Sequence, residues 1–547
     1  MKLKNLIAVS ALTISCLFSS PSMGEEKQIK NVILMIPDGM SVTGTTLARL
    51  YKGESLALDP LASGLMITWN SDGTIADSAP AGSAIATGWK SQSGNIASLG
   101  QDYSGKNNKT AHEDEYLRPV ATLLEAAKLS GKSTGIISTS EFMHATPADF
   151  SAHDPSRKNY DNLTEQIAYN NLDVILGGGE KYLKPENRKD NENIEEIMLS
   201  RGYSIVKTPQ DLKGFKGEKL LGVFGKSENH TALSYDLDRD ENLEPSIAEM
   251  TQKAIDVLSQ NKNGFFLMVE GSKVDWAAHA NDPVGIVSDV VAFDNAVNVA
   301  VKFAKTNDNT LVVIVSDHGN SGISIGDRST SKTYDKTKWT HFVDPIKKAK
   351  LTGEGFEELL ISKAALNDPA MIKSLAKEWL GIDDISDDEI AAIMNYEKTH
   401  KKGDLNYVVG PMIAKRASIG FTTNGHTGED VVLYSYDPRG RLLGGLLDNT
   451  QVAEFVADSI GVDLTKTTET LFIDAKEAFN KKNANVEEDL SDVNNPTLVV
   501  TKGNQKLVIP RNKSIAILND EEVNSNGVNV LSNSKWYISK QLVGLIN

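Results

Sequence analysis

The sequence predicts an α/β fold, a doubly wound and mostly parallel sheet with helices on both faces. Two observations indicate this class. Short β-branched runs end in polar or glycine-containing turns, and helical segments lie between the runs. Continuous apolar runs are typical of strands that are buried on both faces, and such strands are usually parallel. Strands that alternate with helices favour a sheet covered on both sides.

Five runs are the predicted strands of this sheet. They are NVILMI at 31–36, STGIIS at 133–138, DVIL at 173–176, FFLMV at 265–269 and LVVIV at 311–315. Helices are predicted over 119–128 and 246–260. In the second helix Ser246 and Glu249 form a capping box ahead of an apolar stripe.

Residues 1–24 have the pattern of a secretory signal peptide. Lys2 and Lys4 precede an apolar run that ends in small residues, so export to the periplasm or the medium is expected. Cys16, the only cysteine, lies in this segment, and the mature chain would therefore contain no disulfide. No other stretch is expected to span a membrane.

Length and net charge limit the domain organisation and the kinds of partner that can be expected. The 547 residues exceed one typical domain, which favours a large domain with insertions. The net charge of −16 argues against nucleic acid as a specific partner, and a site for an anion must be built locally.

The predicted organisation is a catalytic domain over 25–326 and 407–475, with two further segments. Residues 327–406 are rich in Lys, Asp and Glu and are predicted to be an insertion, a crown over the site or a subunit contact, with helices at 371–380 and 387–394. Residues 476–547 are predicted to be a small β-rich appendage. Its strands are expected at 497–501, 506–509, 514–518 and 536–539.

Carboxylates and histidines follow three of the predicted strands. Functional residues of a doubly wound sheet collect at the carboxyl ends of strands, although a single Asp there can equally be a helix cap or a turn residue. Asp275 and His279 are four residues apart, so on a helix they share one face. The full set of nitrogen and oxygen ligands, which contains no sulfur, suits catalytic zinc: Asp38, Asp275, His279, Asp317, His318 and His426.

Ser78 is a candidate nucleophile within the stretch TIADSAPAGSAIATG. It stands where a helix would begin, with Pro80 at an early helical position and Asp77 beside it. Backbone amides at a helix start bind anions, and the small side chains allow close approach. No histidine is adjacent in sequence, so metal activation is more natural than a Ser-His-Asp relay. Taken alone, Ser78 could be a simple N-cap.

From Asn31 to about Asp430 the chain resembles the alkaline phosphatase family of metal-dependent phosphomonoesterases, because six motifs match in order. The resemblance implies that Ser78 is the residue that becomes phosphorylated. It implies one zinc ion on Asp275, His279 and His426, and a second on Asp38, Asp317 and His318, with Asp38 also reaching a magnesium ion.

The same resemblance places the magnesium and phosphate ligands. Thr146, in the segment His144-Ala145-Thr146-Pro147, matches a magnesium ligand together with Glu270. Arg157, eleven residues further on, matches the arginine that clamps the substrate phosphate. Trp276 stands where many relatives have Lys or His. The resemblance implies that Trp276 lies at the substrate phosphate, and that Trp276 and His144 together affect how phosphate and magnesium are bound.

The implied activity is hydrolysis of small phosphate monoesters at alkaline pH through a phosphoserine, with two zinc ions and one magnesium ion. Homodimers are common in the family, but no residue here decides the oligomeric state. Phosphodiesterases and sulfatases of the same superfamily are the alternative, and Thr146, Glu270 and Arg157 favour monoesters over them. A phosphate-binding protein without turnover is the alternative from another class.

Overall fold

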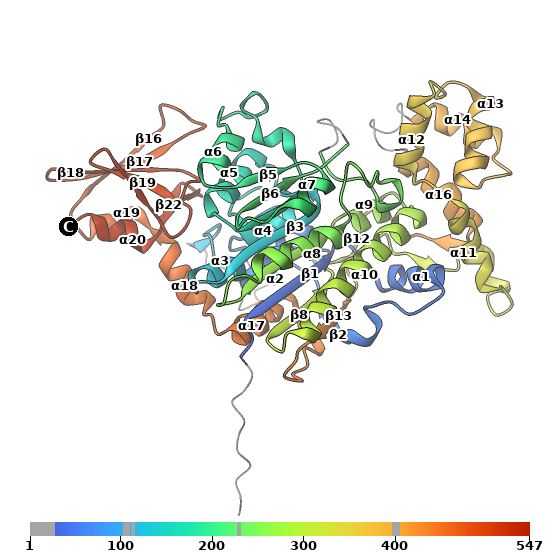
Figure 1. The fold of residues 1–547 in the computed structure, drawn as a ribbon, viewed down its shortest axis with the longest axis horizontal. Coiled ribbons are helices and arrows are strands. Elements are labelled where there is room, and N and C mark those ends of the chain that lie inside the picture. Colours follow the sequence, from blue (N-terminus) through green and yellow to red (C-terminus); the bar gives the residue numbers. More distant parts are fainter. Residues whose placement is uncertain (1–27, 102–109, 111–114, 227–230, 397–404) are drawn as a thin grey trace, which may run out of the picture.

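The structure is a computed structural model that describes residues 28–101, 110, 115–226, 231–396 and 405–547. The predicted signal peptide, residues 1–24, lies outside the described residues. A ten-stranded sheet forms the centre of the molecule, with the insertion at one end and the C-terminal strands at the other (Figure 1).

The sheet has the order β14-β2-β13-β8-β1-β7-β3-β4-β6-β5. Its strands are β1 Asn31–Pro37, β2 Ala62–Ile67, β3 Ser133–Glu141, β4 Val174–Gly178, β5 Ser204–Val206, β6 Leu220–Val223, β7 Phe265–Gly271, β8 Thr310–Val315, β13 Val431–Tyr436 and β14 Gly445–Asp448. The seven strands from β8 to β5 are mutually parallel, and β13 runs antiparallel to both β8 and β2. The predicted mostly parallel sheet and its five strands are confirmed.

Five further strands were not predicted, namely β2, β5, β6, β13 and β14. All five have only three to six residues, and β2 and β14 are partly exposed, so none shows the long apolar run that marks a central strand. These segments are extended because they pair with neighbouring strands, and not because of a local sequence pattern.

Helices cover both faces of the sheet. Ile33 and Met35 of β1 join one hydrophobic cluster with α8 (Ile247–Leu258) and α10 (Pro283–Thr306), whereas Val32 and Leu34 join another with α2 (Ser78–Thr87) and α3 (Leu123–Leu129). Alternate residues of a strand point to opposite faces, so this division confirms the doubly wound architecture.

The predicted helix starts are close to those observed. Helix α8 begins after Ser246, whose capping box with Glu249 is present. Helix α3 begins at Leu123, four residues after the predicted start, because Thr122 rather than Pro119 caps it through Glu125. Ser78 is the first residue of α2, as predicted.

Helix α10 is, among the described residues, the one helix long and apolar enough to cross a membrane by length and composition. The expectation that no stretch after the signal peptide could span a membrane was therefore wrong for this helix by length and composition. In the structure 72% of its apolar window is buried, and the helix packs against α1 (Val42–Lys52), α8 and α9 (Lys273–His279). That burial is typical of a core helix.

The region predicted to be an insertion is helical. It contains α11 Trp339–Lys348, α12 Gly353–Ser362, α13 Pro369–Leu375, a π-helical turn at Ala376–Leu380 and α14 Asp387–Met394, and it packs against α16 Asn406–Arg416. Its apolar residues Ile346 and Phe356 belong to the same cluster as α10. The boundaries 327–406 remain a prediction.

The C-terminal region is β-rich, as predicted. A five-stranded antiparallel sheet consists of β16 Asn485–Asp489, β17 Thr497–Lys502, β18 Gln505–Pro510, β19 Ile515–Leu518 and β20 Glu521–Asn524. A second, three-stranded sheet joins β15 Ile473–Asp474, β22 Lys535–Ile538 and β21 Val530–Ser532. These strands pack on α19 (Ala475–Asn480) and α20 (Lys540–Leu545), at the left of Figure 1.

Candidate active site

The carboxyl ends of β1, β7 and β8 meet at one edge of the sheet and carry the acidic residues. Asp38 follows β1, Glu270 lies near the end of β7, and Asp317 follows β8. All three side chains are fully buried. Because β1 lies between β7 and β8, their carboxylates are brought together without any long loop.

Ser78 faces this acidic edge from the first turn of α2. Its side chain is buried, and its Oγ lies 3.1 Å from Nε2 of His318. Nδ1 of His318 lies 3.2 Å from the carbonyl oxygen of Gly319, which can only accept a hydrogen bond. Nδ1 therefore holds the proton of the neutral ring, and the lone pair on Nε2 is directed at Ser78.

Asp38, Asp317 and His318 form one group of potential metal ligands. One ligand atom from each lies within 4.8 Å of the others. Nε2 of His318 is 3.4 Å from Oδ1 of Asp38 and 3.3 Å from Oδ2 of Asp317. Asp38 accepts no hydrogen bond within the described part of the chain on either carboxylate oxygen. A cation would satisfy these buried oxygens.

Asp275, His279 and His426 form a second group. Nε2 of His279 is 3.3 Å from Oδ2 of Asp275, and Nε2 of His426 is 3.5 Å from Oδ1. The two Nε2 atoms are 3.1 Å apart. The pairing of β12 (His426–Thr427) with β9 (Gly319–Asn320) brings His426 beside His318.

The imidazole tautomers of this second group also favour a metal. Nδ1 of His279 lies 2.6 Å from the carbonyl oxygen of Asn424, and Nδ1 of His426 lies 2.7 Å from that of Ala76. Both Nδ1 atoms must therefore donate, so in a neutral ring each Nε2 would carry a lone pair. Burial lowers the pKa of each imidazole, but hydrogen bonds with Asp275 outweigh it and raise the pKa, for His426 to about 9, so without a metal these rings can donate from Nε2 to that carboxylate. This arrangement, with carbonyls that fix the rings from behind, is typical of histidines that bind a metal.

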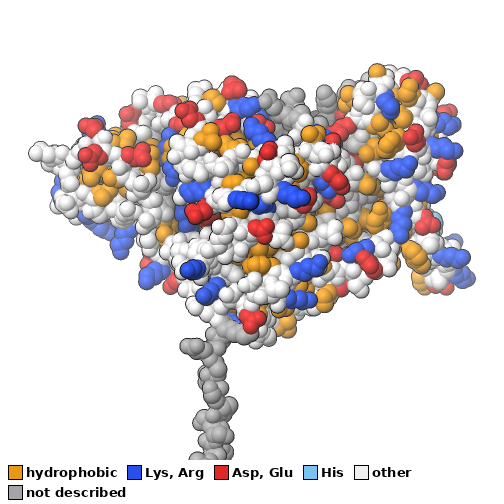
Figure 2. Space-filling view, viewed as in Figure 1, with side chains coloured by type: hydrophobic (Ala, Val, Ile, Leu, Met, Phe, Trp, Pro, Cys, Tyr) orange, Lys and Arg blue, Asp and Glu red, His pale blue; other side chains and the backbone are white. Residues whose placement is uncertain are grey.

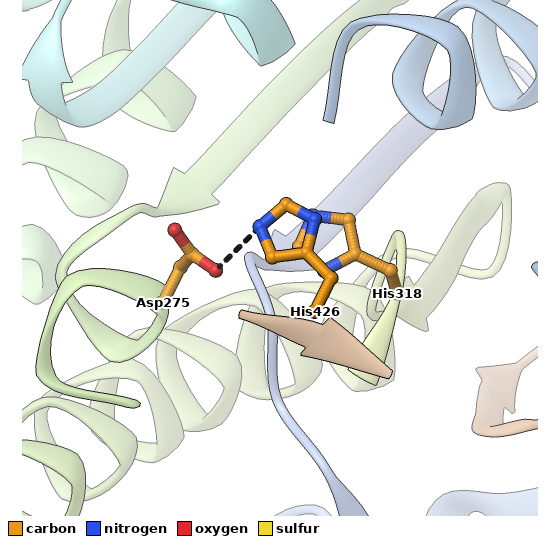
Figure 3. Close-up of side chains that lie close together, drawn as sticks. All are labelled: Asp275, His318 and His426. Carbon is orange, nitrogen blue, oxygen red and sulfur yellow. Dashed lines mark ion pairs between the residues drawn. The ribbon is translucent and has the colours of Figure 1, made fainter. Parts of the chain in front are cut away.

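The two groups are adjacent. Asp275, His318 and His426 themselves offer ligand atoms within 4.8 Å of one another, and Figure 3 shows the two imidazole rings overlapping beside the carboxylate of Asp275. The ring centroids of His318 and His426 are 3.7 Å apart. The structure thus brings the six predicted zinc ligands into one continuous site.

Thr146 and Glu270 are the residues that the family resemblance matches to magnesium ligands. Thr146 is in the first turn of α4 (Ala145–Ser151). Its Oγ1 and Oε1 of Glu270 are buried and have no hydrogen-bond partner among the described residues. Oε2 of Glu270 is within 3.5 Å of Oγ of Ser140. Unpaired buried oxygens of a hydroxyl and a carboxylate fit a hard cation such as magnesium.

The carboxylates of the site have strongly shifted pKa values. Burial, followed by repulsion from Asp317, raises the pKa of Asp38 well above its usual range. Burial likewise raises the pKa of Glu270 to about 8. For Asp275 burial raises the pKa, but hydrogen bonds with His279 and His426 outweigh it and hold the pKa well below its usual range. The site therefore contains more negative charge than it can hold ionised without a cation.

Arg157 is held by two partners beside Ser78, the candidate nucleophile. Its Nη1 donates to Oδ1 of Asp77 at 2.5 Å, and its Nη2 lies 3.2 Å from Nε2 of His144. Burial and the charge of Arg157 lower the pKa of His144 to about 4, so His144 is neutral at neutral pH. The ring of Trp276 lies edge-on to His144 at 6.0 Å. All of the site residues predicted from the sequence thus lie together.

Two supporting residues were not identified as site residues from the sequence. Asn320 is buried, and its Nδ2 donates to Oδ1 of Asp275 at 2.6 Å, which orients that carboxylate. Gly39 has φ +64°, and a Cβ there would lie 2.5 Å from Oδ1 of Asp275. Asn320 directly follows the Asp317-His318-Gly319 segment, and Gly39 follows Asp38, so their proximity to ligands was the available signal.

The fold and the site together define the class: an enzyme with a doubly wound α/β fold, in which a serine at a helix start faces clustered carboxylates and imidazoles. The alkaline phosphatase family model matches residues 29–462, and the chain belongs to that family. It is therefore a phosphatase that acts on phosphate monoesters.

Individual relatives agree with this assignment. The chain is 35% identical over 483 residues to alkaline phosphatase 4 of Bacillus subtilis, covering 83% of this chain and 96% of the relative. It is 29% identical to the repressible alkaline phosphatase of Saccharomyces cerevisiae, covering 85% and 87%. The solved cold-active alkaline phosphatase from Shewanella sp. is similar in structure, with a TM-score of 0.66, 30% identity and coverage of 79% and 99%.

Proposed function

We propose that this phosphatase works through a phosphoserine on Ser78, with two zinc ions and one magnesium ion as cofactors and an alkaline pH optimum. One observation carries the proposal. The hydroxyl of Ser78 lies beside a cluster of three imidazoles and several buried carboxylates, and oxygens of Asp38, Glu270 and Asp317 in this cluster have no hydrogen-bond partner among the described residues.

The residues present fit the proposed ions. Asp275, His279 and His426 would hold one zinc ion, and Asp38, Asp317 and His318 the other. Glu270 and Thr146, with Asp38, would hold magnesium. When bound, the zinc ions would lower the pKa of the serine hydroxyl and of a water molecule and offset the charge of the phosphate oxygens.

The chain's own groups account for the remaining chemistry. Oγ of Ser78 attacks phosphorus, and the bond from phosphorus to the alcohol oxygen breaks in line, which leaves a phosphoserine and an alcohol. Water then attacks the phosphoserine and releases inorganic phosphate. Arg157, oriented by Asp77 and His144, binds two non-bridging oxygens throughout with its planar guanidinium.

The pKa values of the ligands support the proposed alkaline optimum. Burial raises the pKa of Glu270 to about 8, so without a metal this carboxyl is mostly protonated at neutral pH, and burial also raises the pKa of Asp38 well above its usual range. Metal binding requires the deprotonated form, and the affinity of the site for its ions therefore rises with pH.

The test compares nitrophenyl phosphate with the matching diester across pH 6 to 11, using mature protein loaded with zinc and magnesium. We expect fast monoester hydrolysis that rises with pH, is lost in the presence of a chelator and is lost in Ser78→Ala. Trapping of a phosphorylated protein at acidic pH in the wild type, but not in Ser78→Ala, supports the intermediate. Preference for the diester would contradict the assignment of Thr146, Glu270 and Arg157.

We also infer that the mature protein is exported, because residues 1–24 combine basic residues, an apolar run and small residues before Glu25. Cell fractionation combined with N-terminal sequencing checks this inference. An intact N-terminus on protein found inside the cell would contradict it.

A further inference from the structure

A cleft of about 790 Å³ opens beside Arg157, between the catalytic domain and the C-terminal strands. Residues 157–162 form one wall and residues 182–190 contribute another. The third wall comes from Val493, Asn494 and Arg511 in the β-rich region. These three residues lie outside the segment 29–462 that the family model matches. The cleft thus begins at the residue that holds the substrate phosphate and ends on a part of the chain that the family match does not include.

The C-terminal wall is held in place by buried polar contacts. Nδ2 of Asn512 donates to Oε2 of Glu165 at 3.0 Å, and Oδ1 of Asn512 accepts from Nε2 of Gln166 at 3.1 Å. Nζ of Lys513 lies 2.7 Å from Oε1 of Glu192. Arg511 therefore sits next to two residues anchored on the catalytic domain, and its position relative to Arg157 is fixed.

The cleft carries cations with unused donors. Lys158 and Lys189 are exposed and form no ion pair within the described ranges. Nη2 of Arg511 donates to Asn162 and to the carbonyl oxygen of Asn494, but its Nε is buried without a hydrogen-bond partner among the described residues. Because Arg511 lines the cleft, its positive charge would stabilise an anionic ligand there.

Cations outnumber acidic residues in the cleft. The acidic residue Asp190 is neutralised by Arg188, from which it accepts two hydrogen bonds at 2.9 and 2.5 Å. Asp161 accepts one hydrogen bond from the backbone of Lys189 at 3.1 Å and keeps its charge, and Glu141 is buried. Against these stand the four cations that line the cleft, Arg157, Lys158, Lys189 and Arg511.

Tyr160 and Tyr182 supply an apolar surface in the same cleft. Their rings are in an edge-to-face arrangement, with centroids 5.0 Å apart and planes at 72°. An aromatic or sugar ring of a substrate can pack against such a pair while its charged substituent reaches the cations.

We propose that this cleft binds the alcohol part of the phosphomonoester and favours substrates whose alcohol part carries a second anionic group, a carboxylate or a phosphate. The inference rests on the proposed function, because Arg157 must hold the reacting phosphate at the mouth of the cleft. Arg511 is then a specificity residue supplied by the C-terminal region.

The experiment compares kcat/KM for phenyl phosphate, 4-carboxyphenyl phosphate and 1,4-phenylene bisphosphate at low ionic strength. The measured quantity is kcat/KM for each substrate that carries a second anionic group, divided by kcat/KM for phenyl phosphate. This ratio cancels general effects of a substitution on the reaction. In Arg511→Gln we expect this ratio to fall about fivefold, as for loss of one partly exposed ion pair. Arg511→Lys should retain most of the preference, and added salt should reduce it in the wild type.

Lys506→Gln is the matched control, because Lys506 is an exposed cation on β18 that does not line the cleft. It should keep the wild-type ratio. Should Arg511→Gln fail to fold, as judged by its thermal unfolding midpoint, Lys189→Gln tests the same charge from the opposite wall.

The outcomes separate the two proposals. Hydrolysis of all substrates with the same ratio in the wild type, Arg511→Gln and Lys189→Gln overturns the cleft inference and leaves the phosphatase intact. If the ratio in Arg511→Gln falls for the bisphosphate alone, the result supports the cleft inference and restricts the second anionic group to phosphate. A reduced ratio for the carboxylate alone restricts it to carboxylate. No hydrolysis of phenyl phosphate by the metal-loaded wild type overturns the proposed function, and this inference with it.

Discussion

At the scale of single residues, the site depends on side chains that orient the ligands as well as on the ligands themselves. Asn320 donates to Oδ1 of Asp275 and also contacts its backbone carbonyl oxygen at 3.2 Å. Loss of such an outer partner typically lowers metal affinity ten- to a hundredfold. We therefore predict that Asn320→Ala weakens zinc binding by about that factor, measured by competition with a chromogenic chelator. Asn485→Ala, at an exposed position, is the control, and equal zinc affinity in both variants would contradict the role of Asn320.

At the scale of elements, the cap of α8 can be tested by a single hydroxyl. Oγ of Ser246 accepts a hydrogen bond from the backbone N–H of Glu249 at 3.2 Å, and the carboxylate of Glu249 accepts one from the backbone N–H of Ser246 at 2.8 Å. Ser246→Ala should lower the free energy of unfolding by about 1 kcal/mol. Hydrogen exchange should become faster in the first turn of α8. Ser200→Ala removes an exposed hydroxyl that caps no helix start and should leave that exchange unchanged.

The insertion offers a pH-dependent test at the same scale. Arg416 of α16 forms two hydrogen bonds with Glu389 of α14, at 2.8 and 2.9 Å, and they lower the pKa of Glu389 to about 2. A depressed carboxyl pKa stabilises the fold above the unfolded value near 4.3 and loses that contribution as pH falls toward 2.

Glu389→Gln should therefore destabilise the protein by about 1 kcal/mol at pH 7 and by much less near pH 2.5. Denaturant unfolding at the two pH values, followed by fluorescence, measures the difference. A destabilisation of the same size at both pH values would show that packing, and not the ion pair, accounts for the effect.

At the scale of the whole molecule, stability and metal content should be linked. Asp38, Glu270 and Asp317 are buried together, and without cations their repulsion and desolvation oppose folding. Ions that bind only the folded state stabilise it by mass action. A chelator should therefore lower the unfolding midpoint of the wild type by several degrees, with recovery when zinc and magnesium are restored. An unchanged midpoint in metal-depleted protein, verified by elemental analysis, would contradict this linkage.

The surface of the molecule agrees with a phosphatase of small substrates. On the face seen in Figure 2, basic and acidic side chains are interspersed, with no broad basic stripe. Together with the net charge of −16, this distribution on that face does not favour nucleic acid as a specific partner. Positive charge is instead built locally, at Arg157 and in the cleft beside it.

The sequence alone determined the fold class and the five central strands, and with the family resemblance it predicted the site residues that the structure brings together. The strands β1, β7 and β8 carry the strongest local patterns, since both of their faces are buried and their runs are almost entirely apolar. The motifs Asp77-Ser78, Asp317-His318 and Asp275 to His279 could be identified because their chemistry is local in sequence.

The tertiary structure decided what depends on distant pairing. It placed His426 against His279, 147 positions away, formed the short strands β5, β6 and β14 by register, and assigned Asn320 its role. It also brought Arg511 to a cleft beside Arg157. No local pattern encodes such contacts, because they arise when parallel strands align their carboxyl ends and a separate β-rich region packs onto the same surface.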